Sequence, residues 1–330
     1  MRISPKHIMC AIDFSGFGPL IMGYGKALAR EFQADLSLCH IIQDTVMLSS
    51  HAQAGFATEE VTAQRIEDAK EAIDLLSEEA DMEANSIVSL GHPADEITRM
   101  AKKHGVDLVI AATHGGSGIK RFLVGSVTDR LVKTLECPLL VLHSDAKDQS
   151  GTVNLPLKRI LVGCDFSQGS ELAFDYALSL AQEFEAELHL VHVIKPHKQV
   201  ELGSADYIKI QEGDYPGWDR SDFLHLQESA AGEEFERRKR LLNRLERQLG
   251  NMVPQDSRHW CTPVTSLRQG EPYLELLDYA QSYEIDMIVL GIHGHSLLEK
   301  FLVGSTTDRV ISRAGCPVMA VRQTGKPLNS

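Results

Sequence analysis

The sequence contains two copies of one long pattern, and this duplication constrains the fold more than any other feature. Residues Phe122–Arg130 match Phe301–Arg309 at all but one position, at an offset of 179 residues. Asp13 and Asp165 each begin the segment Asp-Phe-Ser, at an offset of 152 residues. A repeat of this length is too long for a solenoid unit and indicates a duplicated domain. The chain is therefore expected to fold as two similar domains.

The offset between the copies changes along the chain, which locates an insertion in the second copy. It is 152 residues for His40 and His192 but 179 for Gly91 and Gly270, so 27 extra residues lie between His192 and Gly270. The polar stretch 144–157, which contains Gly and Pro, is typical of a linker. The expected organisation is a first domain over 1–146, a linker over 147–157 and a second domain over 158–330.

The composition excludes several classes of protein. Lys and Arg number 33 against 46 Asp and Glu, for a formal net charge of −13, and the basic residues are scattered, so the chain is expected to repel nucleic acid. No apolar run approaches the roughly 18 residues that a membrane-spanning helix needs. The N-terminus lacks the apolar segment of a secretory signal, and the six cysteines have no Cys-x-x-Cys spacing. We therefore expect a cytoplasmic protein with reduced cysteines.

Short β-rich runs alternate with segments of helical period in both copies. Apolar runs such as Ile160–Cys164 and Met287–Leu290 predict strands that are buried on both faces, as in a parallel sheet covered by helices. Each domain is thus expected to be a doubly wound, Rossmann-like α/β fold with a parallel five-stranded sheet. In the first copy, strands are expected near 7–12, 36–42, 85–90, 107–112 and 138–143, with helices near 17–32, 59–80, 93–104 and 125–135. In the second copy, strands are expected near 159–164, 187–193, 263–268, 286–291 and 317–322.

A glycine motif follows the fourth expected strand of each copy. The second copy reads Gly291-x-x-Gly294, nine residues, then Gly304-Ser305, and an amphipathic segment follows. The first copy has the same spacing with alanine at the first position, Ala112. Glycines between a strand and a helix let the backbone approach a ligand closely, and the first N–H groups of the helix are unpaired donors. Because parallel sheets bind ligands at the carboxyl ends of their strands, the motif predicts a nucleotide site in each copy, bordered by the aspartates that end the first strands.

Simpler interpretations of the same residues stay open. The glycines before the helices could only shape a turn, Ser126 and Ser305 could be ordinary helix N-caps, and the aspartates Asp13 and Asp165 could cap the following helices. His40 and His192, at the ends of the second expected strands, are interpreted as packed or hydrogen-bonded structural residues rather than catalysts. His114 and His293 lack partners at metal-ligand spacing, which argues against a metal site. The stretch Gly23-Tyr24-Gly25 lies inside an expected helix and is not taken as a dinucleotide fingerprint.

The inserted stretch near 195–230 mixes aromatic residues with Asp, Glu, Gly and Pro and shows no lasting periodicity. Because it follows the second strand, it would leave from the ligand edge of the sheet and could form a lid or a partner surface. A tolerated surface loop is the alternative. The aromatic residues that keep the lid hypothesis open are Tyr207, Tyr215, Trp218 and Phe223.

The glycine motif, its flanking strand and helix, and the later Cys-Pro pairs (Cys137-Pro138 and Cys316-Pro317) resemble the ATP-binding signature of the universal stress proteins. The resemblance covers both halves, so the chain looks like a tandem member of that family with adenine nucleotide alpha hydrolase-like domains. It implies that Asp165 and Val193 border the adenine and ribose. It further implies that Gly291, His293 and Gly294 approach the ribose and α-phosphate, and Gly304, Ser305, Thr306 and Thr307 the outer phosphates. The equivalent set in the first copy is Asp13, Ile41, Ala112, His114, Gly115, Gly125, Ser126, Val127 and Thr128.

The first copy departs from the family pattern at Ala112, where the family usually has glycine. An extra methyl group at a point of close backbone approach is expected to weaken nucleotide binding. The second copy is therefore expected to hold the stronger site.

The resemblance implies a stress-response protein that binds ATP, with any Mg²⁺ held mainly by the phosphates, and that acts through unknown protein partners. The motifs place no carboxylate pair, nucleophile with base or arginine cluster against a γ-phosphate, so at most slow ATP hydrolysis is expected. There is no Gly-x-x-x-x-Gly-Lys-Ser/Thr loop either. The alternatives are a partner- or apolar-ligand-binding protein that does not use nucleotide, and an enzyme that consumes ATP.

The family resemblance also implies a strand order of 3-2-1-4-5 in each half. This order places the apolar strands near 138–143 and 317–322 at sheet edges, where exposed backbone groups tend to pair. Since the linker begins directly after the first of these strands, the two halves are expected to pair through them within one chain. Any homodimer would then use other surfaces.

Overall fold

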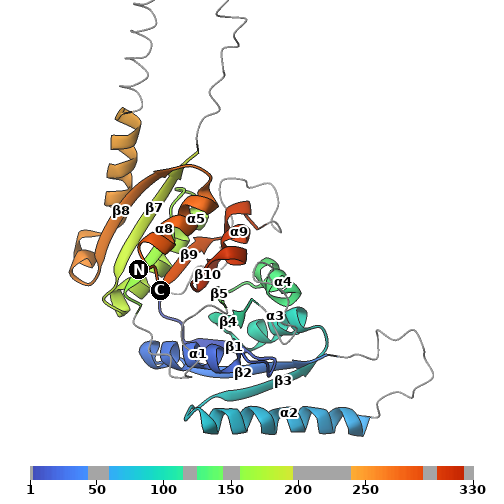
Figure 1. Cartoon of the computed structure of the whole chain (residues 1–330). Helices are drawn as coiled ribbons and strands as arrows, with labels where there is room; N and C mark the ends of the chain where they lie inside the picture. Colours follow the sequence, from blue (N-terminus) through green and yellow to red (C-terminus); the bar gives the residue numbers. More distant parts are fainter. Residues whose placement is uncertain are drawn as a thin grey trace, which may run out of the picture.

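The computed structural model describes residues 3–43, 59–113, 125–143, 157–195, 239–292 and 303–322 (Figure 1). The first half contains β1 (His7–Ala11), α1 (Gly18–Phe32), β2 (Asp35–Ile42), α2 (Glu59–Glu79), β3 (Asn85–Leu90), α3 (Pro93–His104), β4 (Leu108–Ala112), α4 (Ser126–Thr134) and β5 (Leu139–Leu142). The second half contains β6 (Arg159–Gly163), α5 (Gln168–Glu183), β7 (Glu187–Ile194), a helix over 239–252, the 3₁₀ helix η2 (Gln255–His259), β8 (Thr262–Gln269), α8 (Pro272–Ser282), β9 (Met287–Gly291), α9 (Ser305–Arg313) and β10 (Val318–Val321). The expected strands are all present, with ends that differ by at most one residue.

All ten strands form one sheet, in the order β3-β2-β1-β4-β5-β10-β9-β6-β7-β8. Each half has the expected order of a doubly wound domain, with parallel pairing throughout. The two halves meet through β5 and β10, which pair antiparallel with Met319 opposite Leu140. The expected pairing of these two edges within one chain is therefore confirmed, and it merges the two five-stranded sheets into one.

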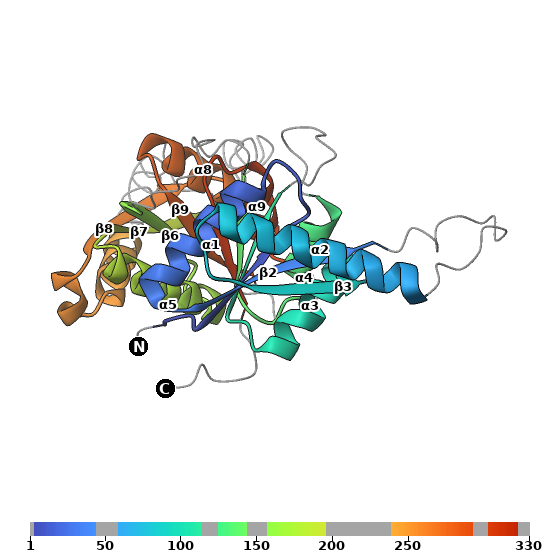
Figure 2. The same cartoon turned by 90° about the horizontal axis from the view of Figure 1, so that it is seen from below.

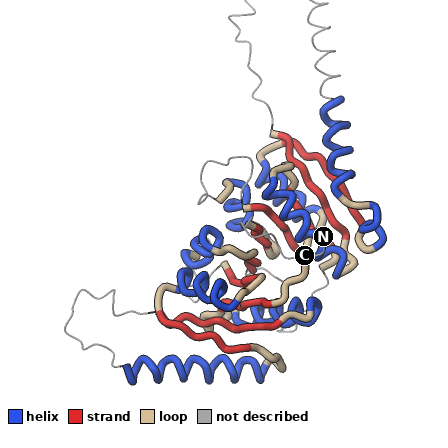
Figure 3. Tube along the Cα trace, turned by 180° about the vertical axis from the view of Figure 1, so that it is seen from behind, coloured by secondary structure: helices blue, strands red, loops and turns tan. Residues whose placement is uncertain are grey.

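The helices cover the two faces of this sheet, as Figure 3 shows. Side chains alternate between the faces: Leu140 and Met319 of the junction belong to the core beneath α1, α2 and α5, whereas Val141 and Val318 belong to the core beneath α3, α4, α8 and α9. Both cores contain residues of both halves. The halves are thus joined by continuous apolar packing as well as by strand pairing.

Helices α1 and α5 lie side by side across the junction (Figure 2). The rings of Phe32 and Phe184 meet edge to face with centroids 6.5 Å apart, and the backbone N–H of Ile3 donates to Ser179 Oγ at 2.8 Å. The stretch Gly23-Tyr24-Gly25 lies inside α1, as expected, and a side chain at Gly25 would collide with the Cys10 sulfur. The second glycine of that stretch therefore serves helix packing.

Candidate functional site

The aspartates that follow β1 and β6 organise the turns into the next helices. Asp13 Oδ1 accepts a hydrogen bond from the Ser15 N–H, and Asp165 Oδ1 accepts one from the Ser167 N–H, each at 3.0 Å. Ser167 is the N-cap of α5, and its Oγ accepts the Ser170 N–H at 3.3 Å. The aspartates therefore stabilise the turns in both halves.

Each aspartate is followed by a phenylalanine in the left-handed region, with φ of 57° at Phe14 and 61° at Phe166. Such φ values are uncommon for bulky residues. The two rings lie on His40 and His192, with centroids 4.4 and 4.8 Å apart, respectively. The Nδ1 atoms of these histidines contact the carbonyl oxygens at the ends of β1 and β6, those of Ile12 at 3.0 Å and of Cys164 at 2.6 Å. The structural interpretation of both histidines is thus confirmed.

The phenylalanines were not among the expected site residues, although the signal was available in the sequence. The segment Asp-Phe-Ser repeats in both copies, and the match included the middle residue. Phe14 remains 43% exposed, so an aromatic surface lies beside Asp13 at the carboxyl edge of the sheet.

The loops after β4 and β9 are closed by the same two hydrogen bonds. The N–H of Gly125 donates to the Thr113 carbonyl at 2.6 Å, and that of Gly304 donates to the Ile292 carbonyl at 2.7 Å. The hydroxyl groups of Thr128 and Thr307 donate back to the last residue of the strand, Ala112 at 2.6 Å and Gly291 at 2.7 Å. Each helix start is therefore held firmly against the end of its strand.

This arrangement changes two details of the expected site. Gly125 and Gly304 are the N-caps, and Ser126 and Ser305 are the first helical residues, without a side-chain cap at either helix. The interpretation of these serines as ordinary N-caps is therefore wrong. Thr128 and Thr307 are buried and donate their hydroxyl protons to the backbone, so what they can offer a ligand is the backbone N–H.

Gly291 is a glycine because of helix packing. A Cβ at this position would lie 2.5 Å from the backbone C and O of Gly169, in the first turn of α5. At the equivalent position Ala112 a methyl group is accommodated. The sequence equivalent of Gly169, at the offset of 152, is Phe17, just before α1. The difference between Gly291 and Ala112 is thus explained by packing within the protein. The expectation that Ala112 weakens ligand binding rested on the ligand alone.

The described candidate residues gather at the carboxyl edge of each half. Strand β1 lies between β2 and β4, and β6 between β7 and β9, so the strand ends meet at one edge. Ile41 and Val193 are located at the ends of β2 and β7, next to β1 and β6. Ser126, Val127 and Thr128, like Ser305, Thr306 and Thr307, form the first turns of α4 and α9. The expected contacts His114, Gly115, His293 and Gly294 lie outside the described residues.

The two edges are separate. Because β5 and β10 run antiparallel, the carboxyl ends of the strands in one half point opposite to those in the other. The chain therefore presents two candidate sites at opposite edges of the sheet, and neither shares strand ends with the other.

The described thiols near these edges are poorly reactive. All six cysteines are free, and burial raises the pKa of the Cys10 and Cys164 thiols to about 12, which makes them poor nucleophiles. Within the described ranges, no group of three or more His, Cys, Asp or Glu residues could hold a metal ion. Backbone N–H groups of a helix start, with the positive end of the helix dipole, favour an anion instead.

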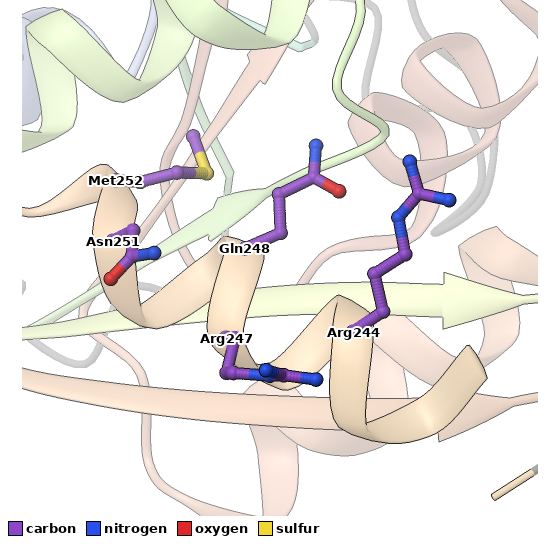
Figure 4. Close-up of a pocket in the computed structure, with 5 residues that line it drawn as sticks. All are labelled: Arg244, Arg247, Gln248, Asn251 and Met252. Carbon is purple, nitrogen blue, oxygen red and sulfur yellow. The ribbon is translucent and has the colours of Figure 1, made fainter. Parts of the chain in front are cut away.

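A shallow groove lies on the helix over 239–252 (Figure 4). Arg244, Gln248 and Met252 extend on one side of this helix, and Arg247 and Asn251 on the other. These lining residues belong to none of the strands or helices that carry the candidate sites. No helix in the described part of the chain is long and apolar enough to cross a membrane.

The sequence model of the universal stress protein family matches residues 5–143 and 156–322. The chain therefore belongs to the universal stress protein family, with one match in each half. A universal stress protein of Mycolicibacterium smegmatis is 25% identical over 325 residues, which cover 96% of each chain. Universal stress protein YxiE of Bacillus subtilis is 30% identical over 144 residues, which cover 41% of this chain and 97% of YxiE.

Solved structures agree with this fold. The crystal structure of a universal stress protein from Archaeoglobus fulgidus superposes with a TM-score of 0.62 at 18% identity, covering 96% of this chain and 98% of the other. A functionally unknown protein from Pseudomonas aeruginosa has a TM-score of 0.60 at 14% identity, covering 97% and 93%. At these identities the similarity establishes the two-part α/β fold of the chain.

Proposed function

We propose that the protein binds ATP at the carboxyl edge of its sheet, most tightly in the second half, and that nucleotide occupancy controls its contacts with protein partners. The observation that supports this most is the pair of closed loops. In each half a glycine N-cap and a buried threonine hold the start of a helix at the strand end, so the first N–H groups of that helix are fixed in position. A fixed row of donors is suited to a polyphosphate.

In the second half, the proposed site combines the ends of β6, β7 and β9 with the start of α9. Asp165 and Val193 would border the adenine and ribose, and Gly291, His293 and Gly294 the ribose and α-phosphate. The helix start at Gly304, Ser305, Thr306 and Thr307 would hold the outer phosphates. The donors would be the backbone N–H groups of Ser305, Thr306 and Thr307, because the N–H of Gly304 already donates to the Ile292 carbonyl. The first half would use the same positions, from Asp13 and Ile41 to Gly125 and Thr128.

Several features of the described residues favour binding over catalysis. The thiols have raised pKa values, and the two histidines at the strand ends are occupied by backbone carbonyls and phenylalanine rings. None of these groups is available to activate a water molecule against a γ-phosphate. Any Mg²⁺ would accompany the nucleotide and be held mainly by its phosphates.

Calorimetric titration with ATP, ADP and AMP tests this proposal. Since charge-assisted hydrogen bonds contribute about 1.5–3 kcal/mol each, ATP should bind at least roughly tenfold more tightly than AMP. Gly304→Val should remove most of this preference. Gly315→Val is the matched control, because a Cβ at Gly315 meets no atom within 4 Å. Equal affinities for the three nucleotides would contradict the assignment of the outer phosphates to the helix starts.

A further inference from the structure

The helices α4 and α9, which begin at the two proposed phosphate sites, end in the same incomplete way. Each has nine residues and is followed by a residue in extended conformation, Leu135 or Ala314. The N–H of that residue returns to the carbonyl of Leu131 or Val310, respectively. No left-handed glycine follows to satisfy the remaining carbonyls, as is common at helix ends.

The missing donors come from the opposite half of the chain. Arg322, just after β10, donates from Nη2 to the carbonyl of Val132 at 2.9 Å and to that of Lys133 at 3.0 Å, both in α4. His143, just after β5, donates from Nε2 to the carbonyl of Ile311 in α9 at 2.7 Å. Since a carbonyl only accepts, Nε2 of His143 carries the proton.

The two contacts are equivalent under the internal repeat. His143 and Arg322 are 179 residues apart, and so are their acceptors Val132 and Ile311, the same offset that relates the glycine motifs. The structure thus contains one arrangement twice, with the two halves exchanging a side chain. The junction β5–β10 makes this possible, because each of these strands ends beside the helix of the other half.

Both side chains are at least partly buried where they contact the helix ends. His143 is 7% exposed. Arg322 is partly buried, and burial lowers the pKa of its guanidinium group, which nonetheless stays charged. A positive charge at a helix C-terminus is favoured by the helix dipole, which offsets part of the cost of burial.

We propose that Arg322 and His143 are positioning residues for nucleotide binding, each acting on the phosphate-binding helix of the opposite half. This inference rests on the proposed function. A nine-residue helix is about 13 Å long and moves as a rigid rod. Its first turn is held by its own strand through the glycine and threonine contacts, and its last turn is held by the other half. The direction of its N–H groups is therefore set by both halves, and each site is incomplete without the other half.

The test uses the full chain with one working site at a time. Gly304→Val leaves the first site and Gly125→Val leaves the second, and calorimetry with ATP reports the site that is left. Arg322→Ala should weaken the first site by roughly three- to tenfold and change the second less than about twofold. His143→Ala should show the reverse. Arg322→Lys, which keeps the charge and N–H donors on a single nitrogen, should restore part of the affinity.

The expected result, in which each variant weakens a different site, distinguishes a positioning role from a general effect on stability. A purely structural tie between the halves would weaken both sites together in either variant, and that result would overturn the proposal. Unchanged binding at both sites in both variants would overturn it as well.

Hydrogen exchange without nucleotide provides a second readout that does not depend on ATP. Arg322→Ala should lower amide protection in the last turn of α4 and leave α9 unchanged, and His143→Ala should do the opposite. If wild-type protein fails to bind ATP, the proposed function is wrong, while the exchange pattern still tests the bracing of the helices. Equal protection in variant and wild type would show that the two contacts do not hold the helices.

Discussion

The two halves of this chain have one topology but differ at the start of their first helices. In the second half, α5 begins against the end of β9, where a Cβ at Gly291 would meet the backbone of Gly169 and Ser170. In the first half, α1 begins at Gly18 with Phe17 as N-cap, no side-chain cap, and Ala112 at the strand end. The comparison teaches that a glycine in a ligand motif can be required by packing within the protein. The alanine at position 112, where the motif has glycine, can then be explained by the neighbouring helix without reference to a ligand.

The outer helices differ in charge as well. Helix α2, beside the edge strand β3, is strongly acidic, whereas the helix over 239–252, which precedes the other edge strand, is basic. Because both lie at the ends of the sheet, a partner that recognises charge would distinguish the two ends of the molecule. The acidic residues of α2 are Glu59, Glu60, Glu67, Asp68, Glu71, Asp74, Glu78 and Glu79, and the basic residues of the other helix are Lys239, Arg240, Arg244 and Arg247.

A third difference lies at the amino ends of the strands. In the second half, buried His189 contacts Tyr279 Oη through Nδ1 at 2.9 Å and Glu187 Oε2 through Nε2 at 3.2 Å. With neutral imidazole, the tyrosine hydroxyl donates to Nδ1 and Nε2–H donates to the carboxylate. The first half has Ser37 and Met100 at the equivalent positions of His189 and Tyr279. In the first half Ser37 Oγ instead contacts His7 Nε2 at 2.7 Å, so the link from the sheet to a helix through His189 and Tyr279 belongs to the second half.

The largest expected effect concerns nucleotide binding. Gly304→Val should reduce ATP affinity about a hundredfold at the second site, since a β-branched side chain displaces the loop and the donors of α9. Gly125→Val should remove less of the total binding, as the second half is expected to hold the stronger site. Calorimetry on both variants decides, with circular dichroism as the control for folding. The reverse order would mean that the first half carries the working site.

The next effect tests the packing explanation of Gly291. Gly291→Ala should destabilise the protein by about 2–3 kcal/mol, because the new methyl group meets the backbone of Gly169, which cannot rotate away. Ala112→Gly should cost no more than about 1 kcal/mol. Urea unfolding curves give both values. If Gly291→Ala were as stable as wild type, the glycine would have to be explained by the ligand after all.

A smaller effect is expected in the polar network. Tyr279→Phe removes the donor to Nδ1 of His189 and should cost about 1–2 kcal/mol, since a buried acceptor is left without its hydrogen bond. Met100→Leu, at the equivalent position of the first half, keeps an apolar side chain of similar volume and serves as the control, with a smaller expected loss. Comparable losses in the two variants would mean that packing, not hydrogen bonding, determines stability at this position.

The smallest effect is a pH dependence. Burial lowers the pKa of His189 below its ordinary value of 6.5, although Glu187 acts in the opposite direction. The neutral form is thus favoured in the folded state, so this contribution to stability is complete above about pH 6.5 and is lost as pH falls through the lowered pKa. His189→Gln should make the free energy of unfolding less dependent on pH between 7.5 and 5. The variant is compared with wild type by chemical denaturation, and an unchanged slope would remove His189 as the cause.

Much of the fold could be predicted from the sequence because its signals are local. Apolar runs such as Ile160–Cys164 mark the strands. The β5–β10 pairing was predicted from a strand order that is not local, because the family resemblance implied it. The carboxyl edge was also predictable, since the motif glycines are tied to strand and helix ends. The reason for Ala112 was missed because it depends on where another helix begins.

His143 and Arg322 were missed because their partners lie in the opposite half and no motif marks them. The repeat shows that both residues follow the last strand of their copy, but the residue types differ. The role of the position follows only from the β5–β10 junction, which brings each side chain to the helix of the other half. Contacts between distant segments of this kind leave little trace in a single sequence.

The antiparallel pair β5–β10 also has a consequence for how this protein can change over generations. In an assembly of two identical subunits, every substitution appears on both sides of the symmetry axis, so a change that helps one site must be tolerated at the other. Here the counterpart of the second subunit is part of the same chain, and each substitution occurs once. One half can therefore acquire an insertion, a basic helix or a buried histidine while the other keeps its earlier form. Because the halves are covalently linked, they stay associated even at low protein concentration.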